Sequence, residues 1–276
     1  MSLKLIYITN NPSVALIAEK NGVDRIMVDL ETLGKEERQK NMNTVKSHHT
    51  VADIATISNL LTKSEMLVRI NPWNETSVSE IEAVISAGAD RIMLPMWKTV
   101  SEVNSFLGAV NGRVRTTLLL ETKEAVEIVD DVLENTLIDD IHIGLNDLHL
   151  SYGLTFMFEL LSNGVVESLC RKFKSKGIPY GFGGIARIGE GMLPAERIIM
   201  EHYRLGSTRA ILSRSFCNTE LIQDIDEIRQ SFEINMKELN EYEISLASKT
   251  PDDFSENKKA LKHAVSDIVA HIKEKK

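Results

Sequence analysis

Short apolar runs rich in isoleucine, valine and leucine alternate with longer stretches of helical periodicity along most of the chain. Such runs, bounded by polar residues and glycine, are typical of buried parallel strands. Eight of them are predicted to be strands, at residues 3–9, 25–31, 66–71, 91–96, 116–121, 140–145, 179–184 and 209–214. A strand followed by a helix, repeated eight times, predicts an α/β fold of the (β/α)8 TIM-barrel class.

The stretches between the predicted strands have the spacing of amphipathic helices. Ile81, Val84 and Ile85 share one face of residues 77–90, and Val126, Val129 and Val132 are spaced likewise in residues 123–135. Several of these stretches end at a glycine, as helix C-caps do. The alternative is a doubly wound open sheet, which would be expected to carry a glycine-rich phosphate fingerprint after its first strand, and residues 9–16 have none.

The C-terminal part departs from the repeat. One long apolar stripe runs from Leu221 to Tyr242, and a second runs from Leu261 to Ile272. We therefore expect a barrel domain over residues 1–245 that carries the catalytic site, and a helical tail over residues 246–276. Because surplus apolar surface commonly packs on a neighbouring subunit, the tail predicts a homo-oligomer.

Composition excludes several functional classes. The 276 residues carry a formal charge of −8 and a pI near 5.5, so no basic surface is expected for nucleic acid or anionic lipid. The two cysteines, Cys170 and Cys217, are too few for a disulfide framework or a zinc-ligand set. No signal peptide and no apolar run of about 20 residues is found, so we expect no membrane contact and a cytoplasmic location.

Polar residues cluster where the predicted strands end. In a parallel barrel all these ends lie at one mouth, where active sites are built. The residues concerned are Asp29, Glu31, Arg69, Asn71, Glu121, Gly144, Asn146, Asp147, Gly184 and Arg187.

Five segments in order along the chain carry a resemblance: VDLE (28–31), VRINP (68–72), AGADRIMLP (87–95), LLLET (118–122) and IGLNDL (143–148). With these segments the chain resembles the HpcH/HpaI aldolase and citrate lyase family of the pyruvate/phosphoenolpyruvate-binding barrels. The resemblance implies a TIM barrel and a lyase that uses a divalent metal. It covers roughly residues 25–150, and the seventh and eighth strands are less diagnostic.

The resemblance implies that Glu121 and Asp147 hold the metal. Carboxylate and keto-acid oxygens suit Mg²⁺ or Mn²⁺, whereas zinc would favour histidine or cysteine. The alternative for each carboxylate is a helix N-cap or a solvated loop position.

Three further residues match functional positions of the family. Arg69 matches the arginine that faces the carbonyl oxygen of the keto acid, and its alternative role is a salt bridge inside the barrel. Asp29 and Glu31 match acidic positions that bind metal-ligated water, orient the arginine or move a proton, and the sequence does not separate these roles. Glu31 has the further alternative of beginning a charged helix.

The chain departs from the family at Thr32. Pyruvate aldolases of the family have a histidine there as acid/base, and acyl-CoA lyases usually have a second acid. His49, which follows His48 in a loop, is the candidate replacement for the acid/base, its alternative being a solvated loop histidine. The missing acid weakens the case for a CoA thioester substrate without excluding it.

The seventh strand runs into a glycine-rich loop at residues 182–193. Backbone amides at the start of the next helix, with Arg187 or Arg214, would suit a phosphate, so a phosphorylated substrate is one reading. The alternative is that the glycines serve only tight backbone geometry. We assign Gly144, Asn146, Gly184 and Arg187 to substrate binding.

These features predict a metal-dependent carbon–carbon lyase, namely a class II aldolase. It would join or split pyruvate, or a similar 2-keto acid, and an aldehyde through a metal-bound enolate. A Schiff-base mechanism is disfavoured because Lys98 and Lys123 lie past their strands. Two alternatives remain open: a citryl-CoA or malyl-CoA type lyase, and a non-catalytic barrel that binds a metabolite or a protein partner.

Overall fold

A computed structural model describes residues 2–34, 49–219 and 221–275 of the chain. Within these residues eight strands follow one another, in sequence order, in a closed barrel, which confirms the predicted α/β barrel class. The strands are β1 (Lys4–Ile8), β2 (Arg25–Asp29), β3 (Glu65–Arg69), β4 (Arg91–Leu94), β5 (Arg115–Leu120), β6 (Asp140–Ile143), β7 (Tyr180–Ile185) and β8 (Arg209–Leu212).

Helices separate the strands, as the periodicity predicts. They are α1 (Pro12–Lys20), α3 (Val51–Ser58), α4 (Ser77–Ser86), α5 (Val100–Val110), α6 (Lys123–Glu127), α7 (Val129–Val132), α8 (Leu145–Ser151), α9 (Glu159–Ser162), α10 (Val165–Ser175) and α11 (Ala195–Leu205). The predicted C-terminal helices are present as α12 (Ile225–Ser245), the 3-10 turn η1 (Leu246–Ser248) and α13 (Pro251–Glu274). No helix of the described chain is long and apolar enough to cross a membrane.

All eight predicted strands are confirmed, and most end earlier than expected. The sixth ends at Ile143, because Gly144 already caps the start of α8. The glycines expected to end helices do so with positive φ angles. At Gly88 a side chain would also be blocked, since a Cβ would lie 2.6 Å from the hydroxyl oxygen of Ser58.

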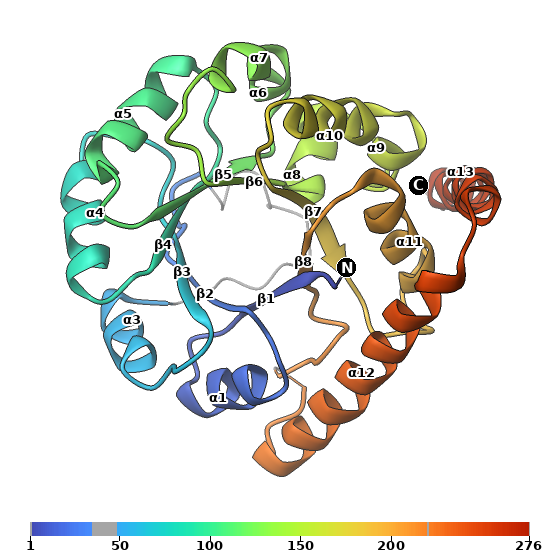
Figure 1. The fold of residues 1–276 in the computed structure, drawn as a ribbon, viewed down its shortest axis with the longest axis horizontal. Coiled ribbons are helices and arrows are strands. Elements are labelled where there is room, and N and C mark those ends of the chain that lie inside the picture. Colours follow the sequence, from blue (N-terminus) through green and yellow to red (C-terminus); the bar gives the residue numbers. More distant parts are fainter. Residues whose placement is uncertain (1, 35–48, 220, 276) are drawn as a thin grey trace. The chain divides into compact units, whose positions relative to one another are not determined.

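The chain divides into two compact units. The N-terminal unit is Ile6–Ile141, and the C-terminal unit is His142–Lys276 together with Met1–Leu5. In the N-terminal unit β2 pairs with β1 and β3, and β4 with β3 and β5, all in parallel. Every residue of β2 and β4 is buried, as expected for parallel strands covered on both faces. Helices α1, α3, α4 and α5 lie on the outer side of these strands (Figure 1).

In the C-terminal unit α13 lies along α11 and α9. The side-chain amide of Asn257 donates to the carbonyl of Arg197 at 3.0 Å, and Lys258 contacts Glu167 at 2.7 Å. The helix begins at Pro251 after a capping box between Thr250 and Asp253. The predicted domain boundary and the packing of the tail on a neighbouring subunit stay predictions.

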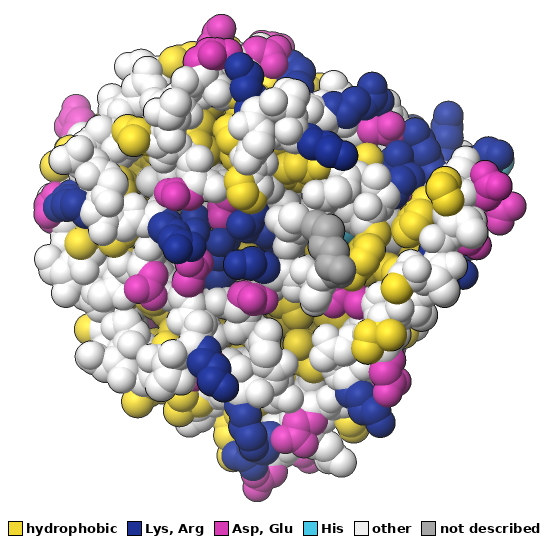
Figure 2. Space-filling model, viewed as in Figure 1, with side chains coloured by type: hydrophobic (Ala, Val, Ile, Leu, Met, Phe, Trp, Pro, Cys, Tyr) yellow, Lys and Arg dark blue, Asp and Glu magenta, His cyan; other side chains and the backbone are white. Residues whose placement is uncertain are grey.

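A layer of charged side chains closes the amino ends of the strands in the N-terminal unit. Glu65 accepts hydrogen bonds from Arg25, Arg91 and Arg115 at 2.8, 3.2 and 2.9 Å. Asp140 pairs with Arg25 at 2.9 Å and with Arg91 at 3.1 Å. Burial raises the pKa of Glu65, but the three guanidinium groups outweigh this and leave it below its usual value. Figure 2 shows basic and acidic side chains side by side near β3, β4 and β5.

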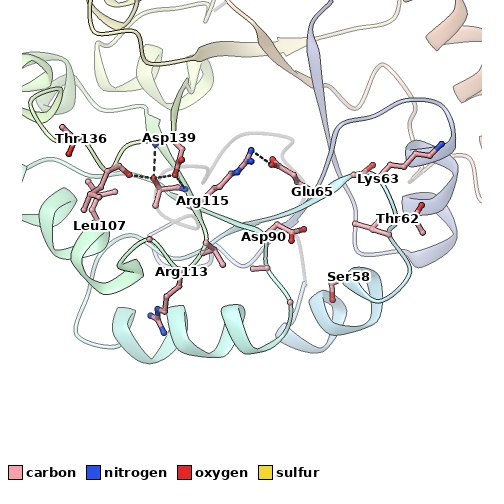
Figure 3. Close-up of a pocket in the computed structure, with 18 residues that line it drawn as sticks. Ser58, Thr62, Lys63, Glu65, Asp90, Leu107, Arg113, Arg115, Thr136 and Asp139 are labelled. Carbon is pink, nitrogen blue, oxygen red and sulfur yellow. Dashed lines mark hydrogen bonds and ion pairs between the residues drawn. The ribbon is translucent and has the colours of Figure 1, made fainter.

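This layer borders a cavity of about 810 Å³ formed by the loops that lead into β3, β4, β5 and β6. Several of its charged groups have partners: Arg115 faces Glu65 (Figure 3), and Arg113 binds Glu82 through two bonds of 2.8 and 2.7 Å. Asp139 accepts the amide of Thr116 at 2.7 Å. The amino ends of barrel strands usually serve stability, and these pairings agree with that role.

Candidate active site

Arg69, the last residue of β3, lies between two carboxylates from the end of β2. The register pairs Asp29 with Arg69 across the two strands. Asp29 binds the guanidinium through two bonds, Nε to Oδ1 at 2.9 Å and Nη2 to Oδ2 at 2.8 Å. Nη1 lies 3.2 Å from Oε2 of Glu31. Both carboxylates are buried, so this is a desolvated, geometrically fixed charge cluster.

The cluster keeps Arg69 charged. Burial by itself would lower the pKa of Arg69, but Asp29, Glu31 and Glu121 together outweigh burial and raise it. The salt-bridge alternative for Arg69 is therefore present in the structure. It leaves part of the guanidinium group unused, because the two hydrogen bonds to Asp29 take two of its five N–H groups.

His49 contacts the same cluster. The backbone amide of Asp29 donates to Nδ1 of His49 at 2.9 Å. An accepting Nδ1 carries no proton, so the ring proton of the neutral imidazole lies on Nε2. His49 is partly buried next to the N-cap residue of α3, Thr50, and is not a fully solvated loop side chain. Its neighbour His48 lies outside the described residues.

Glu121 directly follows β5 and is only 3% exposed. The neighbouring Thr122 caps α6, accepting the amide of Ala125 at 3.1 Å, so the N-cap alternative does not apply to Glu121. One carboxylate oxygen accepts the amide of Met96 at 3.2 Å. The backbone of Met96 has a φ of 55°, which is uncommon for a residue other than glycine. In this conformation its amide is available to Glu121.

Asp147 is placed differently from the expectation. The sequence put it at the end of the sixth strand, whereas it lies in the first turn of α8, four residues after Ile143. Gly144 is the N-cap of this helix, with no side-chain cap, and Asn146 and Asp147 follow in the same turn. A carboxylate in a first helical turn is favoured by the helix dipole. No group of three or more His, Cys, Asp or Glu side chains is gathered as a metal site in the described ranges.

The glycine-rich loop after β7 offers a poor phosphate cradle. Arg187 is 48% exposed and pairs with Glu190 at 2.9 Å. The carboxylate of Glu196, in the first turn of α11, accepts the amide of Gly189 at 3.0 Å, and a negative group there would repel phosphate. At Gly184 a Cβ would lie 3.4 Å from the carbonyl oxygen of Ile211 on β8, which is an ordinary contact, so backbone geometry does not require glycine at this position.

Two residues have roles that sequence reasoning did not assign. Asn71 accepts hydrogen bonds from Thr32 and Leu33, and it donates to Glu80 on α4. The backbone amide of Met96 holds Glu121. The role of Asn71 could have been suspected from the sequence, because strand alternation puts its side chain on the same side as that of Arg69. The role of the Met96 amide could not, because no sequence pattern marks a backbone amide.

The family model HpcH/HpaI aldolase/citrate lyase matches residues 5–159. The chain belongs to this family. Membership confirms the resemblance seen in the sequence. Members of the HpcH/HpaI family are lyases, and membership therefore supports a lyase activity. No curated protein matches the sequence.

Solved structures show the same fold at low identity. An HpcH/HpaI aldolase from Desulfitobacterium hafniense DCB-2 is 16% identical over 77% of this HpcH/HpaI chain and 86% of its own, with a TM-score of 0.61. An HpcH/HpaI aldolase/citrate lyase family protein from Burkholderia cenocepacia J2315 is 14% identical over 83% and 95%, with a TM-score of 0.61. Macrophomate synthase is 17% identical over 77% of each chain, with a TM-score of 0.54.

Proposed function

We propose that this member of the HpcH/HpaI family is a divalent-metal-dependent carbon–carbon lyase, a class II aldolase that joins or splits pyruvate, or a similar 2-keto acid, and an aldehyde. One observation carries the proposal: the buried guanidinium of Arg69, fixed by Asp29 and Glu31, with Glu121 contributing to the same electrostatic cluster. A fixed cation of this kind suits the oxyanion that forms when the bond next to a keto group breaks.

The donor set suits a hard divalent ion. Glu121 offers a buried carboxylate, and oxygen donors of this type are preferred by Mg²⁺ and Mn²⁺. We propose Glu121 as a ligand, and Asp147 as a second ligand on the strength of the family resemblance. When bound, such an ion supplies Lewis-acid polarisation of a keto oxygen.

Arg69 stabilises negative charge on that oxygen. N–H groups that Asp29 does not use donate to the oxyanion, while Asp29 holds the guanidinium plane through two bonds. Removing one such donor typically costs about 2.7–4 kcal/mol of transition-state stabilisation.

His49 is suited to hold and deliver a proton. The amide of Asp29 donates to Nδ1 and orients the ring, and His49 is the proposed acid/base residue on this ground.

Gly144, Asn146, Gly184 and Arg187 are retained as proposed substrate-binding residues. The structure favours an aldehyde without phosphate, because Glu196 and Glu190 bring negative charge to the loop after β7.

A screen of aldehydes with pyruvate tests the function. We expect a carbon–carbon product, detected by mass spectrometry, in the presence of Mn²⁺ or Mg²⁺. We also expect its loss on chelation and its recovery when metal is restored. Borohydride added with pyruvate should leave the protein unmodified, and a trapped covalent adduct would contradict the proposed mechanism.

A further inference from the structure

Asn71, two residues after Arg69, joins the turn that follows β2 to helix α4. Its side-chain oxygen accepts three hydrogen bonds from that turn. The donors are the amide of Thr32 at 2.9 Å, the hydroxyl of Thr32 at 3.3 Å and the amide of Leu33 at 3.0 Å. The turn is solvent-exposed, and these bonds hold it against the chain that follows β3.

The N–H groups of Asn71, on its side chain and its backbone, face Glu80 on α4. The side-chain amide donates to Oε1 of Glu80 at 2.9 Å, and the backbone amide lies 3.2 and 3.3 Å from the two carboxylate oxygens. Burial raises the pKa of Glu80, although the bonds from Asn71 oppose the shift. Asn71 is thus fixed by a helix while it holds a turn.

This position requires a carboxamide. It needs an acceptor on the side of the turn and a donor on the side of Glu80, and among short side chains only asparagine supplies the two on separate atoms. Aspartate has the same shape, but it would set one carboxylate against another. The two sets of partners also fix which end of the amide is oxygen.

The turn that Asn71 holds begins directly after Glu31. Beyond β3 the chain stays extended, since the amide of Ile70 donates to the carbonyl of Met93 at 3.2 Å. Side chains two residues apart on an extended chain lie on the same side, so Arg69 and Asn71 point the same way. Arg69 contacts the carboxylate of Glu31, and Asn71 contacts the next two residues.

We propose that Asn71 is a positioning residue that fixes the turn at Thr32 and Leu33 and thereby keeps the carboxylate of Glu31 against Arg69. The inference rests on the proposed lyase function for its catalytic consequence. It also assigns a role to Thr32, where the family pattern has a histidine or an acid: the hydroxyl of Thr32 binds Asn71.

The test is an exchange of donor and acceptor between Asn71 and Glu80. The variant Asn71→Asp should leave the turn poorly held. Amide hydrogen exchange at Thr32 and Leu33 should then rise about tenfold, as expected for the loss of one to two hydrogen bonds. Adding Glu80→Gln restores a donor opposite the new carboxylate, so the double variant should return exchange to within about twofold of wild type.

Activity gives the second readout. We expect kcat of Asn71→Asp to fall about tenfold and to recover in the double variant with Glu80→Gln, in the range typical of groups that orient a site residue. In a Glu31→Gln background, Asn71→Asp should cause no further fall, because Asn71 acts through Glu31. Additive losses would overturn the inference, as would unchanged hydrogen exchange.

The two readouts separate the two proposals. If the wild-type protein shows no lyase activity, the proposed function fails, and hydrogen exchange alone then decides whether Asn71 holds the turn. If Asn71→Asp does not fold, Glu80→Gln alone should raise exchange at Thr32 and Leu33 less than twofold, because a glutamine oxygen still accepts from Asn71. A larger rise would show that the charge of Glu80, rather than the anchoring geometry, holds the turn.

Discussion

Arg69 illustrates how far single residues could be predicted. The motif VRINP pointed to this arginine, and strand placement put it at the carboxyl end of β3. The sequence left its salt-bridge role and its catalytic role as alternatives. The structure shows that the salt bridge to Asp29 takes only two of the five N–H groups, so the two roles are compatible. Such a division among donors depends on side-chain geometry, which no residue pattern encodes.

A buried histidine in the C-terminal unit gives a stability prediction at the same scale. The ring of His202 stacks on Phe182 with centroids 3.8 Å apart, and its Nδ1 lies 2.7 Å from the hydroxyl of Ser207. Burial, with a smaller contribution from His142, lowers the pKa of His202 to about 3. The folded protein therefore keeps this ring neutral at pH values where the unfolded chain protonates it.

We predict that this histidine makes the fold less stable as pH falls below its unfolded pKa of about 6.5. Between that pH and the folded pKa of about 3, the unfolded state binds one more proton, so the free energy of unfolding decreases with decreasing pH. The slope approaches about 1.4 kcal/mol per pH unit for one proton. Urea unfolding of the wild type and of His202→Gln at several pH values measures this slope.

The variant His202→Gln should lose that part of the pH dependence, whatever its stability at neutral pH. His263→Gln, at an exposed position of α13, is the matched control and should keep the wild-type slope. An unchanged slope in His202→Gln would show that other groups cause the acid sensitivity.

Among the structural elements, strands were easier to predict than the boundaries of helices. Parallel strands buried on both faces appear as continuous apolar runs, so all eight were found. Apolar spacing alone did not reveal that residues 123–132 form two short helices, α6 and α7, interrupted at Ile128. The start of α8 at Leu145 was missed for a related reason, since the apolar run continues from β6 into that helix.

The charged layer across β2 to β6 should stabilise the N-terminal unit. Removing one partner of a buried ion cluster leaves uncompensated charge, which typically costs about 3–5 kcal/mol. We predict a loss of this size for Asp140→Ala, because Arg25 and Arg91 both pair with Asp140 and are buried. Urea unfolding monitored by circular dichroism measures it.

The exposed pair of Arg113 and Glu82 provides the control for this prediction. Exposed ion pairs are screened by water, so Glu82→Ala should leave stability unchanged within the error of the fit. Equal losses in the two variants would contradict the distinction between the buried layer and the surface pair.

At the scale of the whole molecule, the family motifs predicted more of the chemistry of the site than the pattern of strands and helices did. Asp29, Glu31, Arg69 and Glu121 lie in the N-terminal unit, whereas Asp147 lies in the C-terminal unit. Periodicity placed most of them near strand ends, but the family motifs were needed to suggest a metal and a keto acid. The hydrogen bonds that hold them, such as Met96 to Glu121 and Asp29 to His49, involve backbone amides. Sequence patterns do not show which side chain a backbone amide meets.

The central claim is that Glu121 binds a divalent cation. Titration of the purified protein with Mn²⁺ in a calorimeter tests it directly. We predict saturable binding by wild type and a loss of more than about 100-fold in affinity in Glu121→Gln, because even outer-shell partners typically contribute 10–100-fold. Glu127→Gln, an exposed position on α6, should bind as wild type does, and Asp147→Asn tests the second proposed ligand separately. Equal affinity in Glu121→Gln and wild type, or no binding by wild type, would contradict the claim.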